Sequence, residues 1–251
     1  MNSNLVGIIA FATIFGSSLF GMRLHAELPN HHLNAETKEV VRLGMGLIAT
    51  MTALLLGLLV ATAKGSYDTQ RNDVILIAGR VAFLDRALAL YGPEASAPRE
   101  LLRRAVESAI PRMWPDKESQ AGQIDPAVPE GKDLYGAIVS LAPQDDVQRS
   151  LKTRALETVI ELSKTRMLLS AREEPSVVTP LLAAVIIWLG IIFLSFGLFA
   201  PSNKIVIITM LVVALAVSSA IFLILELDRP FDGVIQISST PMRNLVGHLG
   251  H

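Results

Sequence analysis

The sequence predicts an all-α integral membrane protein with four helical spans and a helical insert between spans 2 and 3. Only 18% of its 251 residues are charged and 51% are hydrophobic, whereas soluble domains average about 25% charged residues. The charges are also concentrated, because 16 of the 22 Lys and Arg residues and 17 of the 23 Asp and Glu residues lie within 64–174. The two nearly uncharged ends exclude an ordinary soluble globule and a disordered chain.

Four stretches carry no charged side chain and are long enough to cross a bilayer, whose ~30 Å core needs about 20 apolar residues in a helix. Stretches this long exceed a barrel strand, so each is expected to be a helix. The N-terminal stretch has no basic residue before it, which favours a retained span over a cleaved signal peptide. The predicted spans form two hairpins, 1–63 and 176–227, and cover about 4–22, 41–63, 178–199 and 204–226.

Four spans place the N-terminus, the insert 64–175 and the tail 228–251 on one side of the membrane. Six Lys and Arg residues lie near span ends on that side, against four on the other. Because basic loops stay in the cytoplasm, this difference predicts a multi-pass protein of a bacterial-type inner (plasma) membrane with a cytoplasmic N-terminus, insert and C-terminus.

The insert is expected to be helical. Residues 66–91 contain no proline and are expected to continue the second span, so that one long helix runs from the membrane into the cytoplasm. A helix over 96–113 is predicted with Ser96 as its N-cap, and the proline-rich and glycine-rich residues 115–132 are expected to form a loop. Acidic residues after Pro143 begin a further helix that continues to about Arg172.

The second span contains small residues at helical spacing, which form one stripe. Such a stripe can allow helix backbones to pack closely in lipid. Alternatively it lines a pore, where the threonine offers a hydroxyl group and the small side chains leave room for an ion. The adjacent row, Leu47, Met51, Leu55 and Leu59, faces lipid or forms a hydrophobic constriction. The candidate pore-lining residues are Gly46, Thr50, Ala53, Gly57, Met51 and Leu55, with Ala61 continuing the small stripe.

Charged residues at the ends of the spans have two interpretations as well. They form interfacial salt bridges, or in an oligomer they form a charged ring at the mouth of a pore. The candidates are Lys64, Glu226, Asp228 and Arg229.

The sequence gives little support for a metal site, a catalytic site or nucleic-acid binding. The residues His25, His31 and His32 lie near Glu27 and Glu36, but their spacing matches no strong metal motif and a polar interfacial turn is favoured. The chain has no Cys, which excludes thiolate sites, and none of the common hydrolase, metalloprotease or nucleotide-binding motifs. We therefore expect no enzyme activity and no cofactor, and the net charge of −1 gives no reason to expect nucleic acid.

Four segments resemble the bacterial bestrophin-like membrane family: LPNHHLNAETKEVVRLGMGLIATMTALLLGLLVATAK, FLDRALALYGPEA, WLGIIFLSFGLFAP and LELDRPFDGVIQIS. The resemblance covers nearly the whole chain and implies four helical spans with a helical insert. The layout is more distantly similar to bestrophins, which are pentameric anion channels with a pore along the second span. Residues 43–63 lack the aromatic neck of those channels, and no acidic cluster matches their calcium site.

The leading hypothesis is therefore a homo-oligomeric ion channel, a pentamer by resemblance, that conducts small inorganic anions along the second span and its cytoplasmic continuation. One alternative is a cation-selective channel with an acidic ring near Glu226 and Asp228. Another is a non-conducting scaffold or sensor in the bilayer whose insert binds a cytoplasmic partner.

Overall fold

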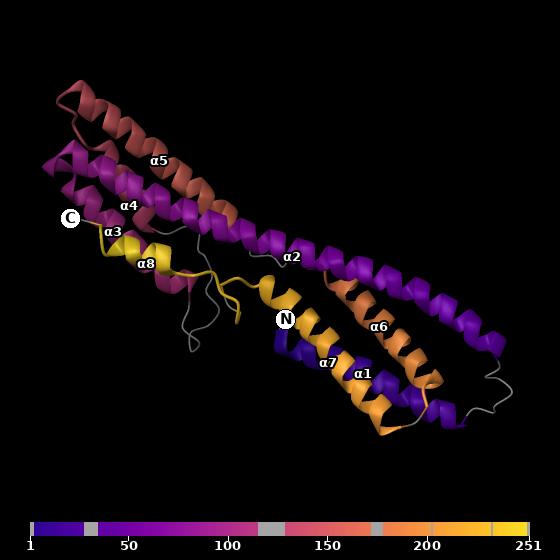
Figure 1. Ribbon diagram of the computed structural model, residues 1–251. Coiled ribbons are helices and arrows are strands. Elements are labelled where there is room, and N and C mark those ends of the chain that lie inside the picture. Colours follow the sequence, from indigo (N-terminus) through magenta and orange to yellow (C-terminus); the bar gives the residue numbers. More distant parts are fainter. Residues whose placement is uncertain are drawn as a thin grey trace. The chain divides into compact units, whose positions relative to one another are not determined.

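The computed structural model describes residues 3–27, 35–114, 129–171, 178–201, 203–231 and 233–249, and within these segments every regular element is helical (Figure 1). The chain divides into two compact units. The first unit comprises 1–66 and 176–228, and the second comprises 67–175 and 229–251.

The first unit contains α1 (Ser3–Glu27), the first part of α2 (Ala35–Tyr91), α6 (Thr179–Phe199) and α7 (Lys204–Leu227). In the part of the chain that the structure describes, these four helices are long and apolar enough to cross a membrane. The four predicted spans are confirmed, and the chain is a multi-pass membrane protein.

The core of the first unit forms where α1 packs against α6 and α7. The Asn203 side chain fixes the start of α7 by accepting hydrogen bonds from the backbone amides of Ile205 (2.6 Å) and Val206 (3.3 Å), as an N-cap does. Helix α2 adds Leu59 and Ala63 to the same core. The fully buried side chains of this core are Ala10, Ile14, Ala63, Val185, Ala214 and Ile221.

Glycines bring α1 and α6 into backbone contact. A Cβ atom added to Gly197 would lie 2.0 Å from the carbonyl oxygen of Ser18, and one added to Gly21 would lie 2.2 Å from the carbonyl oxygen of Leu194. No real Cβ atom fits at such distances. The close helix packing that small residues permit in lipid therefore occurs between α1 and α6.

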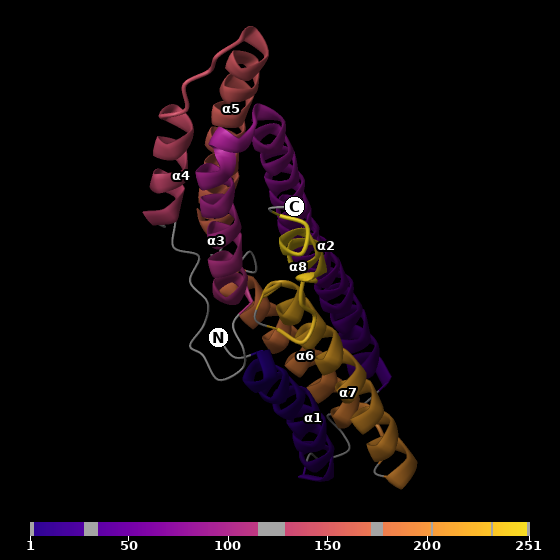
Figure 2. The same cartoon turned by 90° about the vertical axis from the view of Figure 1, so that its left-hand side faces the viewer.

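The second unit contains the rest of α2, a short 3₁₀ turn (Pro93–Ala95), α3 (Ser96–Met113), α4 (Pro129–Val139), α5 (Asp146–Ala171) and α8 (Thr240–Val246). Helix α4 packs against both α3 and α5, and α8 packs against α3 (Figure 2). Helix α2 is continuous from the membrane segment to Tyr91, as predicted. The helix ends at Tyr91, and the next residue, Gly92, has a φ of 124°, a backbone conformation that residues with a side chain rarely adopt.

Two local predictions were wrong. Ser96 is the first residue of α3 rather than its N-cap, because the 3₁₀ turn runs directly into the helix and leaves Ala95 in the cap position. The predicted loop 115–132 ends earlier than expected, because Pro129 begins α4 with a φ angle that already suits a first helical turn. Residues 115–128 of that loop lie outside the described residues.

The C-terminal residues belong to the core of the second unit. The Trp114 indole nitrogen, at the end of α3, donates a hydrogen bond to the carbonyl oxygen of Ile237 (2.7 Å). Ile237 and Met242 are buried among the insert helices, and the Phe231 ring meets Trp114 edge to face. The residues after Arg229 are thus tied to the insert by aromatic and aliphatic packing.

Candidate functional site

The membrane segment of α2 buries one face and exposes the rest. Its buried and half-buried residues recur every three or four positions and include Thr52, Leu59 and Ala63. In the most apolar 18-residue stretch of α2, only 11% of the residues are buried inside the chain, compared with 44% in the corresponding stretch of α6. Most of the surface of this span is therefore available to lipid or to another protein chain.

The small-residue stripe lies on the exposed surface of α2. Gly46, Thr50, Ala53, Gly57 and Ala61 are all exposed. A Cβ added to Gly46 or Gly57 would meet no atom within 4 Å, and the Thr50 hydroxyl donates to the carbonyl oxygen of Leu47 at 2.8 Å. Among the described residues, the stripe does not bring two helices of this chain into close contact. Contact with lipid, packing between chains and a pore lining are the roles that remain for it.

The adjacent apolar row does not keep to one face of the helix. Leu47 and Met51 are 60% and 48% exposed, Leu55 is half-buried, and Leu59 is 3% exposed. Steps of four residues advance by about 40° beyond a full turn, since a helix has 3.6 residues per turn. Three such steps rotate the row by about 120°, from the exposed surface into the core. Leu59 therefore neither faces lipid nor forms a constriction.

The charged candidates differ in exposure. Lys64 is exposed and follows Ala61 on the small-residue stripe. Glu226 is 5% exposed inside the first unit, and Asp228 and Arg229 are half-buried. Lys64, Glu226 and Asp228 each have an interaction partner. An acidic ring at Glu226 therefore requires this side chain to leave its buried position.

The histidine candidates are described only in part. His25 lies in the last turn of α1, where its Nδ1 atom is buried with no hydrogen-bond partner among the residues that the structure describes. His31 and His32 lie outside the described residues. Among the residues that are described, no group of three or more His, Asp or Glu side chains is arranged to hold a metal ion.

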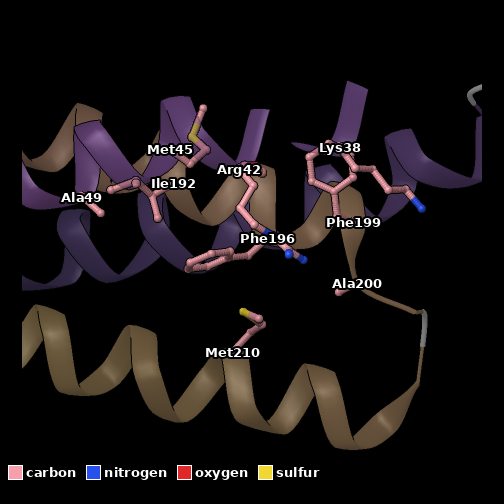
Figure 3. A pocket seen from close by; sticks show the side chains of 11 residues that line it. Lys38, Arg42, Met45, Ala49, Ile192, Phe196, Phe199, Ala200 and Met210 are labelled. Carbon is pink, nitrogen blue, oxygen red and sulfur yellow. The ribbon is translucent and has the colours of Figure 1, made fainter. Parts of the chain in front are cut away.

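A cavity of about 630 Å³ lies between the N-terminal part of α2, the C-terminal part of α6 and the beginning of α7. No sequence pattern predicted this cavity, although Lys38 and Arg42 are spaced i, i+4 directly before an uncharged span. In Figure 3 the Arg42 side chain extends into the space between α2 and α7, near Phe196 and Met210. The site therefore combines cationic groups with apolar walls.

The comparisons with known proteins give one match. Residues 8–242 match the model of the bestrophin-like domain. No curated protein and no solved structure matched. Because the matched segment covers three spans completely, most of the first span and nearly all of the second unit, the chain belongs to the bestrophin-like domain family.

Proposed function

We propose that this protein is a homo-oligomeric channel of the bacterial inner membrane, pentameric by its resemblance to bestrophins, that conducts small inorganic anions along the exposed face of α2. The observation that carries the proposal is the exposed stripe Gly46, Thr50, Ala53, Gly57 and Ala61, in which a Cβ added at either glycine would meet no described atom within 4 Å. Only its first residue, Gly46, also borders the cavity between α2, α6 and α7. A pore needs a helix face with free space, and this face supplies it. The Thr50 hydroxyl donates its hydrogen to the carbonyl oxygen of Leu47, so its oxygen is the only polar side-chain group on the stripe.

The charge at the end of the stripe favours anions. Lys64 follows Ala61 by three residues and is exposed, so copies of α2 around an axis form a ring of ammonium groups. Basic rings favour anions electrostatically. The acidic ring of the cation-selective alternative has less support, because Glu226 is only 5% exposed whereas Lys64 is exposed.

Thiol labelling tests the pore face directly, because the chain has no cysteine to label in the background. Ala53→Cys and Gly57→Cys place a thiol on the stripe. Gly16→Cys is the matched control, because Gly16 is an exposed glycine of α1 with no atom within 4 Å of an added Cβ. A membrane-impermeant, charged thiol reagent is expected to label both stripe positions and to leave Gly16→Cys unlabelled.

Ion flux supplies the second readout. Purified protein in liposomes is expected to conduct chloride, and labelling of Ala53→Cys is expected to reduce the flux while Gly16→Cys is unaffected. Lys64→Gln is expected to shift the reversal potential toward cations in asymmetric salt. An intact oligomer that conducts no anion at any pH, with stripe positions that resist labelling, contradicts the proposal and favours the scaffold alternative.

The orientation of the protein in the membrane is part of the same proposal. The N-terminus, the insert and the C-terminus lie in the cytoplasm, as the excess of basic residues at those ends predicts. Ser140→Cys carries an exposed thiol in the second unit. It is expected to react in inside-out vesicles and to be protected in intact cells, and labelling from outside the cell contradicts this orientation.

A further inference from the structure

The α2–α6–α7 cavity lies where the apolar segments of its three helices begin or end. Arg42 is the last charged residue before the uncharged run 43–63. Helix α6 ends at Phe199 and α7 begins at Lys204. Lipid headgroups and water meet protein at such positions, because a charged side chain is costly deeper in the hydrocarbon. The cavity is thus placed at an interface between headgroups and acyl chains.

Both cations of the cavity lack a partner within the described part of the chain. Lys38 and Arg42 are exposed and line the cavity one helical turn apart. Neither forms an ion pair or hydrogen bond with a described residue, whereas Arg80, Arg99 and Arg103 in the second unit all do. Two uncompensated cations that share one cavity favour an anion with several oxygen atoms, such as a phosphate group.

The remaining surface of the cavity is mostly apolar. Met45, Ile192, Phe196 and Met210 line it together with the nearly buried Ser195, which carries the only hydroxyl among the lining side chains. Figure 3 shows the Phe196 ring beside the end of the Arg42 side chain, with Met210 reaching toward both from α7. A soluble inorganic anion gains nothing from these apolar groups, whereas an acyl chain is stabilised by covering them.

We propose that the cavity binds an anionic phospholipid. Its phosphate contacts Arg42 and Lys38, and an upper part of one acyl chain covers Phe196, Ile192 and Met210. The volume of about 630 Å³ lies within the range of small-ligand sites. The lipid would join α2 to the α6–α7 hairpin, and this role is independent of whether the protein conducts ions.

Lipid retention measures the proposed site. The intact oligomer is purified in a mild detergent, supplied with equal amounts of phosphatidylglycerol and phosphatidylcholine, and the retained lipids are counted by native mass spectrometry. We expect the wild type to retain phosphatidylglycerol preferentially. A basic residue near an anionic lipid contributes about a fivefold change in affinity, so Arg42→Gln should lower the preference about fivefold, and adding Lys38→Gln should lower it further.

Lys204→Gln is the matched control. Lys204 is an exposed cation at the start of α7, close in the chain to the cavity, but it does not line it. Its substitution removes the same charge and is expected to leave the preference unchanged. A loss equal to that of Arg42→Gln means general surface attraction and overturns the proposal.

Two further outcomes overturn it without requiring a substitution. Equal retention of the two lipids by the wild type excludes an anionic site. Displacement of phosphatidylglycerol by millimolar inorganic phosphate indicates a site for a soluble anion. If Arg42→Gln fails to assemble, Phe196→Ala tests the apolar wall with both cations intact, and the number of retained phosphatidylglycerol molecules should fall.

Discussion

The contact between α1 and α6 makes the stability of the first unit sensitive to a single methyl group. In Gly197→Ala the new Cβ would lie 2.0 Å from the carbonyl oxygen of Ser18 and 3.1 Å from the backbone nitrogen of Met22. These are backbone atoms, so no side chain can rotate to make room. The two helices must instead separate by about 1 Å, which weakens their packing.

The cost follows from overpacking. Extra methylenes in a tight core typically cost about 1–3 kcal/mol, and a clash with backbone belongs at the upper end of that range. Alanine recovers up to about 1 kcal/mol of helix propensity relative to glycine. We therefore expect Gly197→Ala to lower the free energy of unfolding by about 2 kcal/mol, with Gly21→Ala giving a similar loss.

The assay is unfolding of the purified protein in mixed detergent micelles, followed by circular dichroism. Gly57→Ala is the control, because an added Cβ meets no atom of this chain within 4 Å. It should equal or slightly exceed the wild type in stability. If Gly197→Ala and Gly57→Ala are equally stable, the α1–α6 backbone contact is absent and the reasoning fails.

Three predictions concern the second unit. Asp85 accepts two hydrogen bonds from Arg99 (2.9 and 3.2 Å) in a mostly buried ion pair. Asp85→Asn should therefore lower the free energy of unfolding, measured by thermal or chemical denaturation, by about 2 kcal/mol. A loss of stability that occurs only at low salt would contradict this, because it indicates an exposed ion pair. Hydrogen bonds from Arg103 and its neighbour lower the pKa of Glu100 to about 2. The stabilisation from this carboxylate is fully present above its pKa in the unfolded chain, near 4.5, and disappears as the pH falls toward 2. The difference in Tm between the wild type and Glu100→Gln should therefore shrink as the pH is lowered from 4.5 to 2. A difference that stays constant contradicts the pKa shift. The Tyr91 hydroxyl is buried with no hydrogen-bond partner among the described residues, so Tyr91→Phe should keep or raise the Tm, whereas a lower Tm would reveal a missing partner.

The periodicity of the sequence reveals one part of the candidate site, the small-residue stripe of α2, but not its neighbours. The stripe from Gly46 to Ala61 was visible from its spacing of three and four residues, which keeps residues on one face of any helix. Spacing does not say which face meets another helix. The close packing that the α2 stripe suggested belongs instead to Gly21 and Gly197, whose neighbours come from a segment far away in sequence.

The cavity could not be predicted for the same reason. Lys38 and Arg42 lie directly before the second span, but the apolar residues Phe196 and Met210 that share the cavity with them lie more than 150 residues away. The drift of Leu59 into the core had a local cause, since every fourth residue of a helix rotates progressively. This rotation could be calculated from the sequence. Whether it carried Leu59 into the core depended on where the other helices of the first unit lie.

The four spans and the helical insert follow from the amino-acid sequence, because exclusion of charge from hydrocarbon over about 20 residues is a local property that needs no partner. Three features follow instead from how the helices pack: α1 and α6 touch through glycine, the small-residue face of α2 is exposed, and two cations line a mostly apolar cavity. Each of these depends on contacts between residues distant in the chain, and such contacts are set by the packing of whole helix faces rather than by the composition of any one helix.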